Sequence, residues 1–485
     1  MAFRAAAWRI RPCTRSARSV RSMRSVAEPE SHFQWRNAST KSGAEKIRNT
    51  QQTASHSDPA SDSTSAAFVG QRAPFMVPTY VRPSPVIDSG KGCYLWDMEQ
   101  RKYLDFTAGI AVTSLGHSDP GVAEIISQQS RMLLHASNLF HNKWTGTLSQ
   151  LLVTYTLESG AMRGAKQAFI CNSGTEANEA AIKFARKVGH SLDPSGAKYE
   201  FVSFYNSFHG RTYGALSATP NPKYQAPFGP MVPGFKYGTY NDIAQLPTLI
   251  TEKTCGVIVE PIQGEGGVHT ATPEFLSALR ARCDEVGAVL IFDEIQCGLS
   301  RTGSLWAHAH PTLEPKDDSL PAHPDILTTA KALGNGIPIG ATIVSQKVSQ
   351  HIQTGDHGTT FGGNPLACRV AQHVLTRLAS SALQSAVRSR SATFRSGLEQ
   401  LRKRFPDAVG DIRGRGLILG LQLAEPYKGM VGDIVTEARQ RGLLVITAGE
   451  GCLRFVPPLI ITDEEIRQGL EILGEAMAEV FKRAA

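Results

Sequence analysis

The sequence predicts an α/β protein with a large domain built on a mostly parallel sheet and a smaller α+β domain at its C-terminal end. The first observation is that short apolar runs alternate with helical patterns from about residue 117 to residue 371. The second is that the runs at 256–262 and 288–295 are almost uniformly apolar, as in strands covered on both faces. The third is that helical patterns mixed with short strand-like runs follow beyond residue 371. A chain of 485 residues is long enough for two or three domains.

The first 66 residues differ in composition from the rest of the chain. They hold 11 of the 51 Lys and Arg residues but only 5 of the 43 Asp and Glu residues, so the net charge of +8 falls to +2 beyond them. The basic charge therefore does not indicate a nucleic-acid partner for the folded part. Residues 1–26 are rich in Arg, Ser and small apolar residues and contain no acidic residue, which is typical of a mitochondrial transit peptide. A disordered basic tail is the alternative interpretation.

Residues 28–66 are rich in Ser, Thr, Gln, Ala and Asp and have few large apolar side chains. Such a segment cannot bury enough surface to offset its ordering entropy, so it is predicted to be a linker. We therefore expect residues 1–66 to be the transit peptide and disordered linker of a protein of the mitochondrial matrix. The expected divisions of the rest are an N-terminal segment over 67–116, a large domain over 117–371 and a small domain over 372–485.

Other features bear on the class of protein. No apolar run approaches the roughly 18–20 residues that a membrane span needs, so no membrane segment is predicted. The eight cysteines are scattered, without a CxxC pair or an adjacent histidine cluster, so neither a disulfide framework nor a metal site is expected. Reduced, buried thiols fit a matrix protein. Residues 86–106 hold two apolar-aromatic runs around polar turn residues, which predicts a hairpin.

Polar motifs follow the predicted strands, where ligand sites lie in open α/β sheets. Ser173, Gly174, Thr175 and Glu176 come directly after the strand-like run 167–171 and directly before a helical pattern. Free backbone N–H groups at such a helix start attract an anion, and the two hydroxyls can add hydrogen bonds to a phosphate. The same S-x-x-E pattern is also an ordinary capping box. The two interpretations are compatible.

A carboxylate and a lysine also lie at the ends of apolar runs. Asp293 lies within the run 288–295, where a buried carboxylate needs a cationic partner such as a protonated pyridine nitrogen. Capping of the next turn is the alternative. Lys331 has apolar neighbours in the sequence and no acidic residue nearer than Asp325. A desolvated lysine has a lowered pKa and acts as a nucleophile, although most lysines are solvated surface charges.

Three further loops carry residues suited to ligand binding. Phe208 lies next to a glycine-containing turn, where an aromatic ring can lie flat against a heterocycle. The glycine-rich loop 357–365 offers the hydroxyls of Thr359 and Thr360 to a phosphate or carboxylate. Arg413 is flanked by glycine and can present a bidentate fork to a substrate carboxylate, or it is a surface residue on a turn. Together, these features match what pyridoxal phosphate chemistry demands.

The motifs SGTEANEAAIKFAR, FHGRT, EPIQGEGGV, LIFDEIQCGLSRTG, TTAKALGNGIPIGA and HGTTFGGNPLA occur in this order. With them the sequence resembles the class-III (ornithine-type) aminotransferases of fold type I, from about residue 74 to the C-terminus. The resemblance implies a fold-type I, pyridoxal-phosphate-dependent transferase that forms a homodimer with shared active sites. Asn335 departs from the family pattern, in which a third glycine is common at this position.

The resemblance also implies roles for single residues. Lys331 would carry the cofactor aldehyde and act as the general base, and Asp293 would face the ring nitrogen. The other residues implied in cofactor binding are Ser173, Gly174, Thr175, Phe208, Gln296 and, from the neighbouring subunit, Thr360. The residues implied in substrate binding are Arg211, Glu265, Thr359 and Arg413. Glu265 would neutralise Arg413 while an amine rather than an α-amino acid is processed.

Within the family, the sequence is most similar to the acetylornithine-specific subgroup, in particular to its fungal mitochondrial members. Residues 108–117 lack the aromatic side chain that ornithine-specific members usually carry here, and an acetylated α-amine needs no ammonium ligand. The expected reaction transfers the δ-amino group of N2-acetylornithine to 2-oxoglutarate, giving glutamate, in arginine biosynthesis. Transamination of ornithine, 4-aminobutyrate or succinyl-diaminopimelate and an aminomutase reaction stay open. A catalytically silent structural partner is a remote alternative.

Overall fold

The computed structural model describes residues 57–313 and 322–484 of the chain. The expected transit peptide therefore lies outside the described residues. Those residues belong to one compact unit, Thr53–Ala485. No helix in this part is long and apolar enough to cross a membrane, and no group of His, Cys, Asp or Glu side chains there could hold a metal ion.

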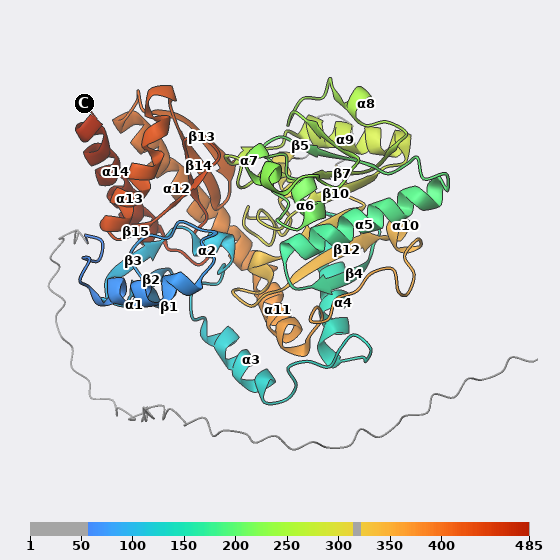
Figure 1. Ribbon diagram of the computed structural model, residues 1–485, viewed down its shortest axis with the longest axis horizontal. Coiled ribbons are helices and arrows are strands. Elements are labelled where there is room, and N and C mark those ends of the chain that lie inside the picture. The colour runs from blue at the N-terminus through green and yellow to red at the C-terminus, as the bar shows by residue number, and fades with distance from the viewer. Residues whose placement is uncertain (1–56, 314–321, 485) are drawn as a thin grey trace, which may run out of the picture. The chain divides into compact units, whose positions relative to one another are not determined.

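A seven-stranded sheet forms the centre of the large domain (Figure 1). Its strands in spatial order are β4 (Ala165–Cys171), β12 (Gly340–Ser345), β11 (Ile326–Thr329), β10 (Val289–Asp293), β7 (Thr254–Val259), β5 (Glu200–Phe204) and β6 (Phe235–Gly238). β12 runs antiparallel to both of its neighbours, whereas the pairs from β11 to β6 are parallel. The prediction of a mostly parallel α/β sheet is confirmed.

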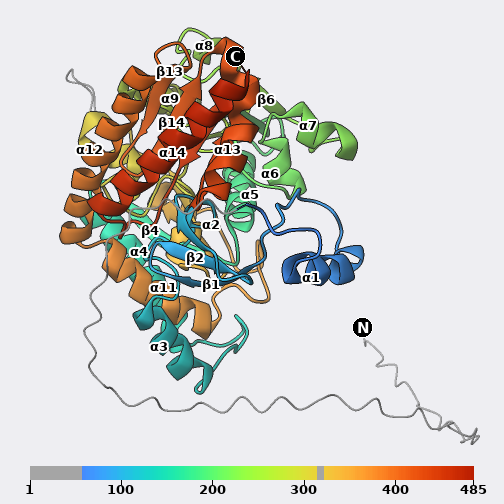
Figure 2. The same ribbon diagram turned by 90° about the vertical axis from the view of Figure 1, so that its left-hand side faces the viewer.

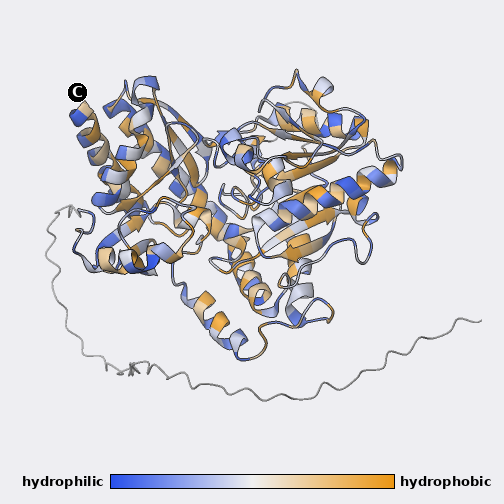
Figure 3. Cartoon of the chain, in the orientation of Figure 1, coloured by the Kyte–Doolittle hydropathy of each residue, from blue (hydrophilic) through white to orange (hydrophobic). Residues whose placement is uncertain are grey.

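Both faces of this sheet are covered, which explains the uniformly apolar runs. Alternate residues of β10 enter two separate apolar clusters: Val289 and Ile291 enter one, and Leu290 and Phe292 enter the other. The first cluster includes the apolar stripe of α5 (Gly174–Leu192), and the second includes that of α9 (Pro273–Val286). Figure 3 shows the apolar residues gathered on the strands, while α5 carries polar residues along its other side.

The C-terminal part forms an antiparallel sheet covered by helices (Figure 2). Its strands are β13 (Val409–Arg415), β14 (Ile418–Leu423), β17 (Cys452–Phe455) and β16 (Ile446–Ala448), and its helices are α12 (Ser381–Arg404), α13 (Val431–Gln440) and α14 (Asp463–Ala484). The predicted boundary at residue 371 falls inside α11 (Pro365–Leu378). That helix continues its apolar stripe across the boundary because Val370, Ala371 and Val374 are all buried in one core.

The N-terminal segment shares a sheet with the C-terminal part. β1 (Ile87–Lys91), β2 (Tyr94–Asp97) and β3 (Lys102–Asp105) form antiparallel pairs, so the predicted hairpin has three strands. β15 (Leu443–Leu444) then adds in parallel to β3. The predicted N-terminal segment 67–116 and the C-terminal part are thus joined in one four-stranded sheet.

The predicted linker ends earlier than expected. Helix α1 (Thr64–Arg72) begins before residue 66, and two polar residues in front of the expected start of order have charged partners. Asp58 accepts hydrogen bonds from the Arg439 guanidinium at 2.8 and 3.1 Å, and Ser65 donates to Glu99 at 2.5 Å. These distant partners could not be read from the local composition.

The turn at α2 (Ala108–Ala111) is left-handed. Its four φ angles are 47° at Ala108, 61° at Gly109, 66° at Ile110 and 62° at Ala111, a conformation that L-residues avoid. The Asp105 carboxylate accepts hydrogen bonds from the N–H groups of the two residues before Gly109, at 2.7 and 3.1 Å. This turn leads into Val112, which lines the cavity around Lys331 described below.

The remaining elements are short or lie at the edges. They are α3 (Pro120–Ser130), α4 (Lys143–Glu158), α6 (Tyr213–Ser217), α7 (Pro222–Gln225), α8 (Leu246–Leu249), α10 (Gln346–Ser349), β8 (Ile262–Gln263), β9 (His269–Thr270) and single 3₁₀ turns at Ala73–Phe75, Ala226–Phe228, Ala307–Ala309, Pro311–Leu313, Lys331–Leu333 and Glu425–Met430.

Candidate active site

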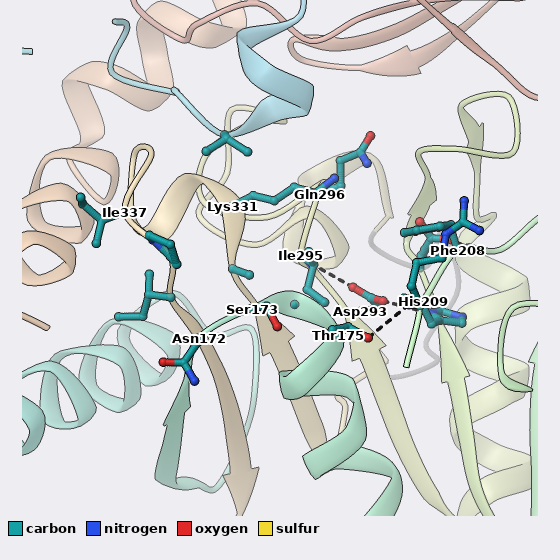
Figure 4. Close-up of a pocket in the computed structure, with 18 of the residues that line it drawn as sticks. Asn172, Ser173, Thr175, Phe208, His209, Asp293, Ile295, Gln296, Lys331 and Ile337 are labelled. Atoms are coloured by element: carbon teal, nitrogen blue, oxygen red, sulfur yellow. Dashed lines mark hydrogen bonds and ion pairs between the residues drawn. The ribbon is translucent and has the colours of Figure 1, made fainter. Parts of the chain in front are cut away.

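A cavity of about 360 Å³ lies beyond the ends of the central strands. Its size falls in the range of small-molecule pockets. Eight of the predicted site residues line it: Ser173, Gly174, Thr175, Phe208, Arg211, Asp293, Gln296 and Lys331. The sheet therefore brings together residues that are up to 158 positions apart in the sequence. Figure 4 shows Lys331 extending towards Gln296, with Asp293 lying between Ile295 and His209.

Asp293, the last residue of β10, is buried and held by three donors. Its Oδ2 accepts a hydrogen bond from Asn178 Nδ2 at 2.8 Å and lies 2.8 Å from His209 Nδ1. Its Oδ1 accepts from the backbone N–H of Ile295 at 3.1 Å. Asn178 is fixed in turn by the Thr328 hydroxyl, which donates to its Oδ1 at 2.8 Å. The carboxylate is therefore oriented before any ligand arrives.

Lys331 lies two positions beyond the end of β11 and has a positive φ of 42°, a conformation unfavourable for a residue with a side chain. This backbone places its side chain in the wall of the cavity. Burial lowers the pKa of Lys331 to about 8, although the nearby Glu265 and Asp293 carboxylates oppose this shift. A substantial fraction of its amine is therefore neutral near pH 8, as a nucleophile requires.

The start of α5 forms a capping box whose first turn borders the cavity. Ser173 Oγ accepts from the backbone N–H of Glu176 at 3.3 Å, and the Glu176 carboxylate accepts from the N–H of Asn172 at 2.5 Å. A Cβ atom on Gly174 would lie 2.8 Å from Ile295 Cγ2, so a larger residue would close this end of the cavity. The first N–H groups of the helix face the cavity, because Gly174 and Thr175 line it.

Phe208 and Arg211 follow β5. The backbone N–H of Phe208 donates to Glu260 Oε2 at 3.0 Å, and burial raises the pKa of Glu260 to about 7. The Arg211 guanidinium carbon lies 3.6 Å from the centre of the Tyr224 ring, a cation–π contact that orients the fork. Arg211 thus adds a positive charge to the wall of a cavity that also contains Asp293 and Glu260.

Glu265 contacts a different arginine from the one predicted. Its Oε1 lies 2.8 Å from Arg454 Nη1, and the same Nη1 donates to Gln296 Oε1 at 3.0 Å. Burial raises the pKa of Glu265, but the neighbouring Arg454 guanidinium lowers it by more, so the pKa lies below its usual value. The predicted pairing of Glu265 with Arg413 is therefore wrong in this structure. Arg454 is buried in β17, within the electrostatic reach of Lys331.

Arg413 lies outside the wall of the cavity. Its Nη2 donates to Gln422 Oε1 at 2.6 Å, and its Nη1 lies 3.3 Å from His269 Nδ1. It lines a second cavity of about 450 Å³ instead. The predicted position of Arg413 at the substrate carboxylate does not agree with this geometry, because the strand β13 aims its side chain towards β9 rather than towards Lys331.

Thr359 and Thr360 also lie outside the cavity wall of this chain. Thr359 Oγ1 accepts from Asn172 Nδ2 at 3.1 Å, so it supports the residue in front of the anion site. Thr360 is exposed, and the neighbouring Phe361 is 64% exposed. The structure therefore brings eight of the twelve predicted residues to the cavity and two more, Glu265 and Thr359, to its immediate neighbours.

Sequence reasoning missed four polar residues of the site: His209, Asn178, Glu260 and Arg454. A signal for two of them was present, since Glu260 and Arg454 interrupt the apolar runs GVIVEPI and CLRFVP. A charge inside such a run needs a buried partner. Asn178 gave no such signal, because its contact with Asp293 spans 115 residues.

Known proteins resemble this chain over most of its length. The family model described as "Aminotransferase class-III" matches residues 77–477. The mitochondrial acetylornithine aminotransferase of Neurospora crassa is 58% identical over 460 residues, which cover 94% of this chain and 97% of the relative. That of Saccharomyces cerevisiae is 47% identical over 413 residues, which cover 84% and 95%.

Solved structures give the same result. The N-acetylornithine aminotransferase from Stenotrophomonas maltophilia is 38% identical, with a TM-score of 0.71, over 86% of this chain and all of that one. The ornithine aminotransferase from Toxoplasma gondii is 33% identical, with a TM-score of 0.79, over 87% and 96% of the two chains. With its fold, its buried lysine and these matches, the chain belongs to the class-III aminotransferases.

Proposed function

We propose that the cavity around Lys331 holds pyridoxal phosphate, the cofactor on which class-III aminotransferases depend. The start of α5 suits the phosphate, since Gly174 leaves space there and the first N–H groups have no partner within the helix. Asp293 suits a protonated ring nitrogen, because its carboxylate is buried and already oriented by Asn178 and His209. Phe208 and Gln296 would lie beside the ring.

The chemistry that pyridoxal phosphate supplies when bound is an aldehyde for amines and a ring that withdraws electrons. The rest of the catalysis falls to this chain. Lys331 Nζ, once neutral, takes the proton from the substrate carbon that bears the amine and would deliver it to the former aldehyde carbon of the cofactor; in the second half-reaction it would move a proton in the opposite direction. Asp293 maintains the charge on the ring nitrogen. The apolar wall formed by Val112 and Ile337 excludes water from this step.

The substrates follow from the relatives and from the Glu265–Arg454 pair. The enzyme transfers the δ-amino group of N2-acetylornithine to 2-oxoglutarate, which yields an aldehyde and glutamate. While Glu265 neutralises Arg454 at 2.8 Å, the wall near Lys331 accepts an uncharged aliphatic stem beside the reacting amine. When 2-oxoglutarate or glutamate binds, Glu265 moves aside and Arg454 receives a carboxylate. Arg211 receives the more distant carboxylate.

The observation that carries this proposal is the convergence of a desolvated amine, Lys331, and a buried carboxylate, Asp293, on one cavity. Its test is a half-reaction. Purified enzyme is mixed with acetylornithine or ornithine, and loss of the cofactor absorbance is followed by stopped flow. We expect acetylornithine to react at least about tenfold faster, a difference of about 1.4 kcal/mol. Faster reaction with ornithine would instead make this an ornithine aminotransferase, and a chain that takes up no cofactor would refute both.

A homodimer with shared sites completes this proposal. Thr360 and Phe361 are exposed beside the supports of the anion site, and the nearby Leu139 and Phe140 are 86% and 70% exposed. Asn138 joins the two segments, because its Nδ2 donates to the Thr359 and Gly362 carbonyls at 3.0 and 2.8 Å. Adjacent exposed apolar side chains mark an interface, so Thr360 would reach the phosphate of the partner subunit.

The dimer is tested with hybrids. Thr360→Ala chains are mixed with Lys331→Ala chains after mild dissociation. Each hybrid then has one site with both residues defective and one with both intact, so about a quarter of the wild-type activity is expected to return in an equal mixture. No recovery would refute the shared site.

The mitochondrial names of the fungal relatives support the same compartment for this protein. Fluorescence microscopy of the tagged full chain tests this localisation.

A further inference from the structure

A second cavity, of about 450 Å³, lies between the large and small domains, away from Lys331. Its wall includes Arg413 on β13, His269 on β9 and Gln263 on β8, together with Tyr205, Thr239 and Asn241 from the loops that follow β5 and β6. None of its lining residues is acidic. Arg413 is the only arginine among these residues, and it gives the cavity a positive charge.

The Arg413 guanidinium is held by Gln422, by His269 and by one exposed carboxylate. Gln422 and His269 contact its two terminal nitrogens at 2.6 and 3.3 Å. Within the described part of the chain its ion-pair partner is Asp411, at 3.7 Å from Nε, and the Asp411 side chain is 57% exposed. Only 20% of the Arg413 side chain is exposed, so most of its charge is desolvated and only weakly compensated. A partly buried arginine in this state suits the two oxygens of a carboxylate.

This cavity adjoins the active site through one hairpin. β8 and β9 pair through Gln263 and His269, and both residues line the second cavity. The loop between them carries Glu265, which pairs with Arg454 beside Lys331. The loop also contacts the small domain, because the Glu265 carbonyl accepts a hydrogen bond from the N–H of Gly449 at 2.7 Å.

We infer that the second cavity binds a small organic carboxylate through Arg413, and that the bound anion holds the β8–β9 hairpin in the conformation in which Glu265 covers Arg454. Its carboxylate would face the free N–H groups of Arg413. Thr239 and Asn241 offer a hydroxyl and an amide to the rest of the ligand. The bound anion would thus lower the affinity of the active site for a dicarboxylate. This coupling depends on the proposed role of the Glu265–Arg454 pair, whereas the binding itself does not.

The binding test uses the cofactor-loaded enzyme and malonate as the probe. Isothermal titration is compared for the wild type, for Arg413→Gln and for Arg454→Gln, with cofactor absorbance as the check on folding. We expect two classes of site in the wild type, of which Arg413→Gln removes one and Arg454→Gln the other. A second variant, Thr239→Trp, fills the cavity and leaves Arg413 in place, and it should weaken the same site at least about tenfold. Unchanged binding in Arg413→Gln and Thr239→Trp would overturn the inference.

The coupling test measures the KM for 2-oxoglutarate at increasing malonate concentrations. Malonate also competes directly at the active site, so the Thr239→Trp enzyme supplies the curve for competition alone. The wild-type KM should rise about fivefold more than that of the variant at saturation, which is a typical allosteric coupling. If the KM curves of the wild type and of Thr239→Trp coincide, the coupling is refuted. The existence of the carboxylate site is then decided by the titrations alone. If instead no acetylornithine half-reaction occurs although malonate binds through Arg413, the proposed function fails and the site stands.

Discussion

Lys331 combines a strained backbone with a buried amine. Its left-handed φ of 42° costs a residue with a side chain about 1–2 kcal/mol, and burial lowers the pKa of its amine to about 8. Both features destabilise the folded chain, and both place a neutral nucleophile in the wall of the cavity. Such a cost at one position is typical of a functional site.

The cost can be measured in the cofactor-free protein by comparison with Lys331→Met. Below pH 8, Lys331 is protonated in both the folded and the unfolded chain. Between about pH 8 and 10.5, the folded chain has lost a proton that the unfolded chain still binds, so the free energy of unfolding rises with pH. Over this pH range, we expect the free energy of unfolding of the wild type to increase by roughly 3 kcal/mol relative to that of Lys331→Met. Urea denaturation at pH 7.5 and pH 10.5 measures it, and parallel pH profiles would contradict a buried charge.

Arg454 and Arg413 are distinguished by their positions relative to Glu265. Arg454 touches Glu265 and Gln296 in the active site, whereas Arg413 lies behind the hairpin that carries Glu265. The loss of one charge-assisted contact to a carboxylate costs about 1.5–3 kcal/mol. Arg454→Gln should therefore raise the KM for 2-oxoglutarate about 10- to 100-fold, with a smaller effect on the acetylornithine half-reaction. If Arg413→Gln raises the KM for 2-oxoglutarate more than Arg454→Gln does, Arg413 binds the substrate carboxylate, as the sequence motif indicated.

Among the elements, the left-handed turn α2 has the least usual backbone. The side chain of Ile110 is 41% exposed, so it adds little core packing to offset its φ of 66°. At a left-handed position a protein with glycine is more stable than one with alanine, because the alanine Cβ clashes with the backbone carbonyl oxygen. In an ordinary helix the order is reversed, by about 1 kcal/mol.

The strain at α2 is tested by two substitutions at one position. Ile110→Gly should be more stable than Ile110→Ala by about 1 kcal/mol, since both remove the exposed side chain and only glycine removes the clash. The control is Ala123 in the right-handed helix α3, where Ala123→Gly should lose about the same amount. Thermal unfolding of the three variants and the wild type gives the comparison. Equal stability of the two Ile110 variants would mean that the turn is unstrained.

The strands and the site differ in how much of them the sequence predicts. Runs such as those ending at Cys171 and Asp293 were predictable, because burial on both faces makes a strand uniformly apolar. Lys331 and Asp293 were found because a charge at the end of such a run is rare. The pairing of Arg454 with Glu265 could not be predicted, because it joins segments 189 residues apart. The glycine that follows Arg413 made that residue the more conspicuous arginine. A two-residue strand such as β15 has no pattern of its own.

At the scale of the whole molecule, the start of the described chain is fastened to the small domain. Asp58 binds the Arg439 guanidinium through both oxygens, and Ser65 and Glu99 join α1 to the N-terminal sheet. Both contacts lie in the range that composition assigned to a linker. They contribute because each partner is already fixed in the fold, so only the N-terminal residues lose conformational freedom.

Two truncated chains test this attachment. A chain that starts at Ser57 keeps these contacts, and one that starts at Ala67 loses them together with the first turn of α1. We expect the shorter chain to be less stable by about 1–3 kcal/mol, with unchanged rates for the acetylornithine half-reaction. The variant Asp58→Asn in the longer chain separates the ion pair from the helix and should account for less than half of the loss. Identical denaturation midpoints for the two chains would show that residues 57–66 do not contribute to the stability of the fold.

The pairing of β15 with β3 has a consequence for the order in which the protein is made. Leu443 and Leu444 lie more than 330 residues after the strand they extend, so this edge stays open until almost the entire chain has left the ribosome. Synthesis is slow compared with the collapse of a domain. The N-terminal sheet is therefore completed only when the last tenth of the polypeptide is made, and until residue 443 emerges the nascent chain exposes the edge of β3 to chaperones.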